Sequence, residues 1–109
     1  MSEKYRKWGL PNSVVAIVRA MCVDYDRRNV AIKYNTVSDD VLKSYRELNG
    51  IINEALEEIE VGIRRDVLND IILNRGYNFS PASPFMAKDT YYARKRKVVY
   101  TIAQRIHLV

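Results

Sequence analysis

Four consecutive cationic residues, Arg94 to Lys97, lie in the segment "KDTYYARKRKVVYTIAQRI", between two tyrosines and a run of aliphatic residues. Guanidinium and ammonium groups donate hydrogen bonds to carboxylates and phosphates, and they stay charged at neutral pH. The segment therefore contains side chains of the type that can bind an anion. Whether they can do so depends on which of them the local backbone turns toward solvent.

The segment has the periodicity of an amphipathic helix over residues 89–108. At about 100° per residue, one side of that helix is apolar, and its members are Tyr91, Tyr92, Val99, Ile102, Ala103 and Ile106. The opposite side carries hydrogen-bond donors at steps of four, three and four, namely Thr90, Arg94, Lys97 and Thr101, with Gln104 and Arg105 extending the row. Lys95 falls within the apolar side, where either its alkyl chain extends past the tyrosines or its ammonium meets an acid of the preceding helix.

A helix with one basic side fits the major groove of DNA, where Lys and Arg donate to phosphates and to guanine edges. The alternative is an ordinary solvated helix surface. Such a surface often has acids four residues from its cations, whereas here only Asp89 precedes the run and no acid follows it. We therefore predict double-stranded DNA as the partner. The predicted contact residues are Lys88, Thr90, Tyr91, Arg94, Arg96, Lys97, Thr101 and Arg105.

A second basic segment, "EKYRKWG", interleaves Lys4, Arg6 and Lys7 with Tyr5 and Trp8. A basic arm with aromatic residues can follow a phosphate backbone or enter a minor groove. The alternative is that Trp8 packs against the first helix. Both interpretations remain open for this arm, which we assign to residues 1–10.

Charge is unevenly distributed along the chain. Residues 1–38 carry +4, residues 39–70 carry −5 and residues 71–109 carry +6, in agreement with the net charge of +5. Such asymmetry is typical of a protein that presents one basic surface to a polyanion.

Three helical segments account for most of the 109 residues and predict a single all-α domain. The first covers "LPNSVVAIVRAMCVDYDRRNVAIKY", the second runs from about Ser38 to Arg75, and the third is the basic helix. Pro81 and Pro84 place a loop over residues 76–88, which we expect to be held to the core by its aromatic side chains.

The second segment has an apolar seam close to a heptad repeat, made of Val41, Tyr45, Leu48, Ile52, Ala55 and Ile59. A continuous helix over 38–75 would be about 57 Å long, whereas a compact domain of this size has a radius of gyration of about 13 Å. Either the helix breaks at Asn49 and Gly50, or it projects and buries its seam against another chain. Because the seam keeps its phase across Gly50, we predict a continuous helix and a homodimer.

No residue pattern predicts catalysis, a cofactor or a metal site. The chain has one histidine, His107, and one cysteine, Cys22. The acids Glu54, Glu57, Glu58 and Glu60 spread around a helix instead of converging. A non-enzymatic protein without a bound cofactor is therefore expected. The single cysteine is consistent with a cytoplasmic protein, and no apolar run approaches the length of a membrane span.

The segment "DTYYARKRKVVYTIAQRIHLV", preceded by "RRDVLNDIILNRGY", resembles the C-terminal region of small phage and prophage regulators of the ArpU and RinA type. This resemblance implies a helix-turn-helix-like C-terminal part related to the promoter-reading region of sigma factors. It also implies transcriptional regulation, with the transcription machinery as a further partner and Arg94 and Lys97 as DNA contacts. The sequence departs from the family between Gly76 and Lys88, where prolines replace a short helix and tight turn.

A second hypothesis comes from the acidic second segment. The chain would then be a helical assembly protein that dimerises through residues 38–75 and docks an acidic protein partner through its basic helix. A dimer without affinity for DNA would favour this alternative.

Overall fold

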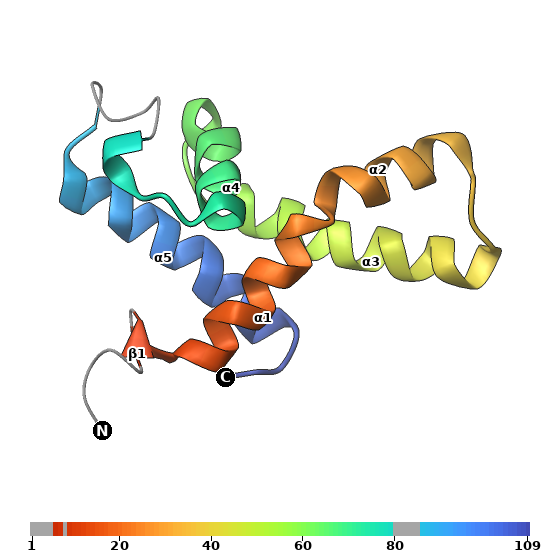
Figure 1. Cartoon of the computed structure of the whole chain (residues 1–109), viewed down its shortest axis with the longest axis horizontal. Helices are drawn as coiled ribbons and strands as arrows, with labels where there is room; N and C mark the ends of the chain where they lie inside the picture. Colours follow the sequence, from red (N-terminus) through yellow and green to blue (C-terminus); the bar gives the residue numbers. More distant parts are fainter. Residues whose placement is uncertain (1–5, 8, 80–85) are drawn as a thin grey trace.

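A computed structural model of the chain describes residues 6–7, 9–79 and 86–109. These residues are mostly helical, with very little strand, which confirms the predicted all-α class (Figure 1). The helices are α1 (Asn12–Val23), α2 (Tyr25–Tyr34), α3 (Asp39–Leu56), α4 (Arg64–Leu73) and α5 (Lys88–Arg105). Two short 3-10 turns, η2 (Val61–Ile63) and η3 (Tyr77–Phe79), flank α4.

Helix α5 lies at the centre of the core. Its buried side packs against α1, α4 and the C-terminal half of α3. The largest fully buried side chains come from all of these elements and include Val18, Ile52, Val67, Leu68, Tyr91, Val98, Val99 and Ile102. The predicted third helix of residues 89–108 is thus confirmed within a few residues at each end.

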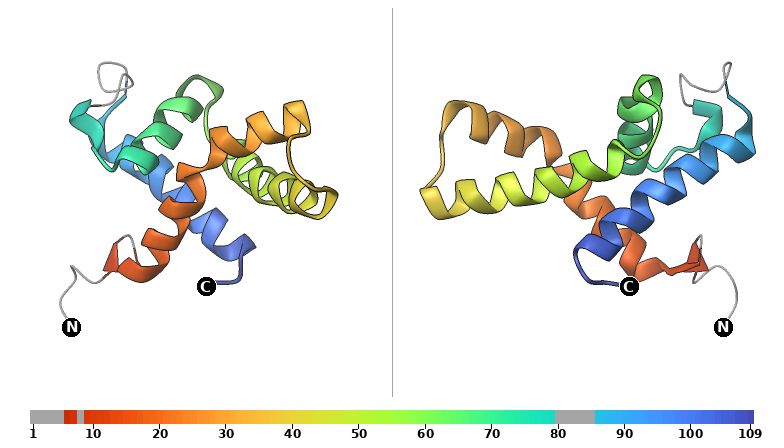
Figure 2. Two further views of the ribbon diagram at one scale, coloured as in Figure 1. Left: turned by 45° about the vertical axis from the view of Figure 1, so that its right-hand side comes forward. Right: turned by 180° about the vertical axis from the view of Figure 1, so that it is seen from behind.

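Helix α2 packs along the N-terminal half of α3, and the pair extends away from the rest of the molecule, as both views of Figure 2 show. The overall dimensions are 42 × 35 × 20 Å. The projecting part of the molecule is therefore a helical hairpin within one chain, and not the single long helix expected from the sequence.

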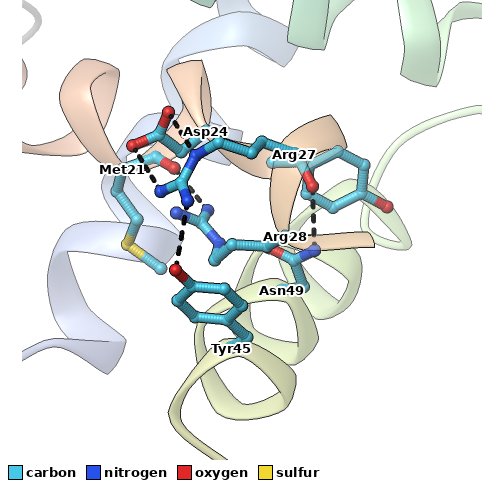
Figure 3. A network of polar contacts seen from close by, with 7 residues as sticks. Met21, Asp24, Arg27, Arg28, Tyr45 and Asn49 are labelled. Atoms are coloured by element: carbon cyan, nitrogen blue, oxygen red, sulfur yellow. Dashed lines mark hydrogen bonds and ion pairs between the residues drawn. The ribbon is translucent and has the colours of Figure 1, made fainter. Parts of the chain in front are cut away.

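The first predicted helix is interrupted at Asp24, whose φ of −93° and ψ of 9° separate α1 from α2. The side chain of Arg28 turns back from α2 and donates to the carbonyl oxygen of Met21 near the end of α1 (Figure 3). A side chain that takes over a backbone carbonyl in this way is a common cause of a helix kink. Arg28 also donates to Asn49 Oδ1 at 2.6 Å, which holds the kink against α3.

The prediction of a continuous helix over 38–75 is wrong. Gly50 lies inside α3 as expected, but α3 ends at Leu56 and the chain turns back through η2 into α4. Glu57, Glu58 and Glu60 follow the C-terminus of α3, where the helix dipole disfavours negative charge. Arg64 holds the turn by donating to the carbonyl oxygens of Ile59 and Glu57.

The predicted dimer seam divides between two environments in the same chain. Ile52, Ala55 and Ile59 are at most 4% exposed and belong to the core around α5. Their assignment to an interface between chains is therefore wrong. Tyr45 is half-buried and accepts a hydrogen bond from Arg27, Leu48 is half-buried, and Val41 is 38% exposed.

Two other predicted segments are described in part. Arg6–Lys7 (β1) pairs antiparallel with Leu10–Pro11 (β2), while Lys4 and Trp8 lie outside the described residues. In the 76–88 loop, Tyr77 packs against α5 with its ring centroid 5.6 Å from that of Tyr91. Residues 80–85 lie outside the described ranges. No helix in the described part of the chain is long and apolar enough to cross a membrane.

Candidate nucleic-acid interface

The buried side of α5 contains two residues that have a structural role. Tyr91 is 0% exposed, so its predicted contact with DNA is wrong. Its hydroxyl donates to Asp70 Oδ2 at 2.7 Å, and the ammonium of Lys95 lies 3.5 Å from the same oxygen. Of the two alternatives for Lys95, the structure confirms the contact with an acid of the preceding segment.

Asp70 joins α4, the following turn and α5. Its Oδ1 accepts hydrogen bonds from the backbone amides of Arg75 and Gly76 at 3.1 and 2.6 Å. Burial by itself raises the pKa of Asp70, but the bonds from Tyr91 and Gly76 and the charge of Lys95 together bring the pKa below its ordinary value. The carboxylate therefore stays ionised and fixes how α5 is rotated about its axis.

Two further tyrosines fix the start of α5. The hydroxyl of Tyr92 accepts a hydrogen bond from the backbone amide of Tyr77 at 3.0 Å. Gly76 has φ +91°, and a Cβ there would lie 2.8 Å from that hydroxyl, so glycine suits both the conformation and the close approach. The turn after α4 is thus packed directly on the first turns of α5.

The side of α5 nearest α3 is partly neutralised. Arg94 donates to Glu60 at 2.7 Å, Thr101 donates to Glu58 at 2.6 Å, and Arg105 Nη1 lies 3.2 Å from Glu54. These partners run in opposite order along the chain, as expected for antiparallel segments. Arg94 holds the pKa of Glu60 below its ordinary value.

The sequence did not predict these three contacts, because helix periodicity brings out only partners within the same helix. The partners are 34, 43 and 51 residues away from α5 donors in the chain. The opposite net charges of residues 39–70 and 71–109 are the signal that could have suggested such pairing. The scarcity of acids within α5, where Asp89 is the only one, is therefore weak support for anion binding.

The side of α5 that faces solvent keeps uncompensated donors. Arg96, Lys97, Tyr100 and Gln104 are all exposed, and no acid pairs with Arg96 or Lys97 within the part of the chain that the structure describes. We call these four residues the exposed face of α5. Together with Ala93, Arg94, Thr101 and Glu58, they line an open groove of about 720 Å³.

Lys88 and Thr90, the predicted contacts at the start of α5, lie outside the exposed face of α5. Lys88 is exposed in the first turn, and Thr90 is half-buried. Lys88 is nine residues from Lys97, which corresponds to about 13 Å along a helix. Lys88 therefore supplies a separate positive charge near the helix N-terminus, where backbone amides and the helix dipole also favour an anion.

The helix-turn-helix-like part is not confirmed. Between α4 and α5 the described residues contain only the three-residue turn η3. Nor does any group of three or more His, Cys, Asp or Glu side chains in the described ranges come together as metal ligands would. Comparison of the chain with protein-family models, curated proteins and solved structures finds no match.

Proposed function

We propose that this protein binds double-stranded DNA without catalysing a reaction, and that it does so through the exposed face of α5. The observation that carries the proposal is the pair Arg96 and Lys97, two adjacent exposed cations with no acidic partner among the described residues. Tyr100 and Gln104 extend the same face by about two turns. Phosphate contacts supply much of the affinity of such surfaces.

The position of α5 supports the proposal in a second way. A recognition element must hold its donors in fixed positions, and α5 is held on its other side by the core and by the Asp70 contacts. Gln104 is a suitable donor and acceptor for a base edge, and adenine is the base that glutamine reads best. Arg96, Lys97 and Lys88 would contact phosphates.

The resemblance to phage and prophage regulators suggests a role in transcriptional regulation for this DNA binding. Of the two DNA contacts implied by the resemblance, Lys97 belongs to the exposed face of α5. Arg94, the other residue implied by the resemblance, is paired with Glu60 and would first have to exchange this partner. Arg96 is therefore a better choice than Arg94 for a first test.

The test is fluorescence anisotropy with a labelled duplex at several salt concentrations. We expect log K to fall with log salt with a slope of several units, and the double variant Arg96→Glu/Lys97→Glu to reduce that slope by about 2. The control is Lys43→Glu/Arg46→Glu, which makes the same charge change at two exposed positions of α3. An equal loss in both variants would mean that only net charge matters, and no binding by the parent protein at low salt would refute DNA binding.

The alternative of an assembly protein has lost part of its support, because half of the predicted seam is buried within one chain. Light scattering of the purified protein distinguishes the two hypotheses further. A stable dimer that fails to bind duplex at low salt is the outcome that favours assembly.

A further inference from the structure

Three acids near the end of α3 cover one side of α5. Glu54 lies in the last turn of α3, and Glu58 and Glu60 lie in the turn that follows. Each contacts a different donor of α5, namely Arg105, Thr101 and Arg94. By contrast, the carboxylate of Glu57, an exposed acid of the same turn, makes no hydrogen bond or ion pair with α5.

The contacts are exposed enough to exchange. The side chains of Arg94 and Glu60 are 37% and 50% exposed, and those of Arg105 and Glu54 are 57% and 52% exposed. Ion pairs between such exposed groups contribute little to stability and are easily replaced by other partners. A phosphate that approaches α5 can therefore compete with these carboxylates for the same donors.

We propose that Glu54, Glu58 and Glu60 act as an intramolecular guard that competes with DNA phosphates for Arg94, Thr101 and Arg105. This inference rests on the proposed function, because the guard occupies donors that adjoin the exposed face of α5. With the guard in place, the available cations of that region are Arg96 and Lys97. Displacement of the guard adds Arg94 and Arg105 to them.

The guard should allow α5 to discriminate between a DNA duplex and smaller anions. A weak or single anion cannot replace all three carboxylates at once, whereas a duplex presents an array of phosphates along the helix. The intact guard should therefore lower affinity for short or isolated anions and for non-specific DNA. Binding that recruits Arg94 and Arg105 would require a DNA segment that follows α5 for several turns.

The test compares two triple variants with the same change of +3 in net charge. The guard variant is Glu54→Gln/Glu58→Gln/Glu60→Gln, and the control is Asp39→Asn/Asp40→Asn/Glu47→Gln, which changes exposed acids of the N-terminal half of α3. We expect the guard variant to bind duplex more tightly than the control. Its salt slope should be steeper than that of the control by about 2, because two more phosphates are contacted.

A slope difference of this size changes the ratio of the two dissociation constants by roughly tenfold between about 50 and 200 mM salt. The gain should disappear when Arg94→Gln and Arg105→Gln are added to the guard variant. Circular dichroism and thermal unfolding check that each variant is folded. If the triple guard variant does not fold, the single change Glu54→Gln, with Glu57→Gln as its control, tests the Arg105 contact alone.

The outcomes separate the two proposals. Equal affinities and slopes for the guard and control variants, with a parent protein that binds duplex, would refute the guard and leave the proposed function standing. Binding by neither the parent nor the guard variant would refute both. Binding by the guard variant alone would refute the proposed function, because the parent protein would not bind duplex, and with it the guard that rests on that function.

Discussion

The ammonium of Lys95 lies 3.5 Å from Asp70 Oδ2, and both side chains are only 4% exposed. This pair connects α5 to α4 inside the core, beside the hydrogen bond between Tyr91 and the same carboxylate. Because a helix cannot rotate without breaking such contacts, the pair also determines which residues of α5 face solvent. Arg96 and Lys97 follow Lys95 directly in the chain and point outward for this reason.

The substitution Asp70→Asn should destabilise the protein by about 3–5 kcal/mol, because it removes the carboxylate charge that lies 3.5 Å from the buried ammonium of Lys95. Urea denaturation monitored by circular dichroism measures this change in the free energy of unfolding. Asp66→Asn in the same helix is the control, since the Asp66 carboxylate makes no hydrogen bond or ion pair with a described residue. Adding Lys95→Met to Asp70→Asn should recover part of the loss, and no recovery would contradict the assigned pairing.

The contribution of Asp70 to the free energy of unfolding should decrease in acid. Its pKa is lower in the folded protein than in the unfolded chain, where the value is about 3.9, so its stabilising effect is complete above that pH. The effect is lost as pH falls through the folded pKa. The difference in free energy of unfolding between the parent and Asp70→Asn should therefore be constant from about pH 7 to 5 and shrink below about pH 4. A difference that grows in acid would contradict this assignment.

The periodicity of the last third of the sequence predicted α5 and its buried side well. The apolar spacing of Val99, Ile102 and Ala103 gives the helix a defined orientation without knowledge of the partners. The position of Lys95 on that side left two alternatives open, either an alkyl chain that extends past the tyrosines or a contact with an acid. Its identity as Asp70 could not be predicted, because it depends on how α4 returns to the core.

Helix breaks and long-range contacts were harder to predict. The interruption at Asp24 depends on the bond from the Arg28 side chain to Met21, and no proline or glycine marks it. The turn after Leu56 likewise has no proline, and the apolar phase of residues 41–59 is the same for a helix against a partner chain and a helix against its own core. Periodicity indicates which side is buried, but it does not indicate by what.

The buried hydrogen bonds of Arg28 at the kink between α1 and α2 lead to a separate prediction. Arg28 is 3% exposed and donates to Asn49 and to the Met21 carbonyl, and burial lowers its pKa although the charge of Asp24 opposes this. Arg28→Met should cost about 1–3 kcal/mol, because Asn49 Oδ1 and the Met21 carbonyl lose a buried donor. Arg46→Met, at an exposed position of α3, is the control and should change the urea midpoint little. A cost equal to that of the control would show that water replaces the guanidinium.

Cys22 provides a direct test of the core. Its side chain is 0% exposed, and burial raises the pKa of the thiol to about 12, with a smaller opposing effect of Arg28. A thiol that is both inaccessible and protonated reacts slowly. We expect an aromatic disulfide reagent at pH 8 to label the native protein at least about a hundredfold more slowly than the urea-unfolded protein. Rapid stoichiometric labelling of the native protein would mean that the contact between α1 and the core opens readily.

Tyr100 allows the uncharged part of the proposed DNA contact to be separated from the charged part. Its side chain is 41% exposed on the same face as Lys97 and Gln104, and it lines the groove. Tyr100→Ala removes contact area but no charge, so the dissociation constant for duplex should rise by about fivefold, equivalent to about 1 kcal/mol. The salt slope should stay the same, in contrast to Arg96→Glu/Lys97→Glu. Tyr34→Ala is the control, since Tyr34 is 64% exposed but lies on α2. If Tyr100→Ala and Tyr34→Ala bind duplex as the parent does, while the charge variant loses affinity, then DNA contacts α5 through its cations alone.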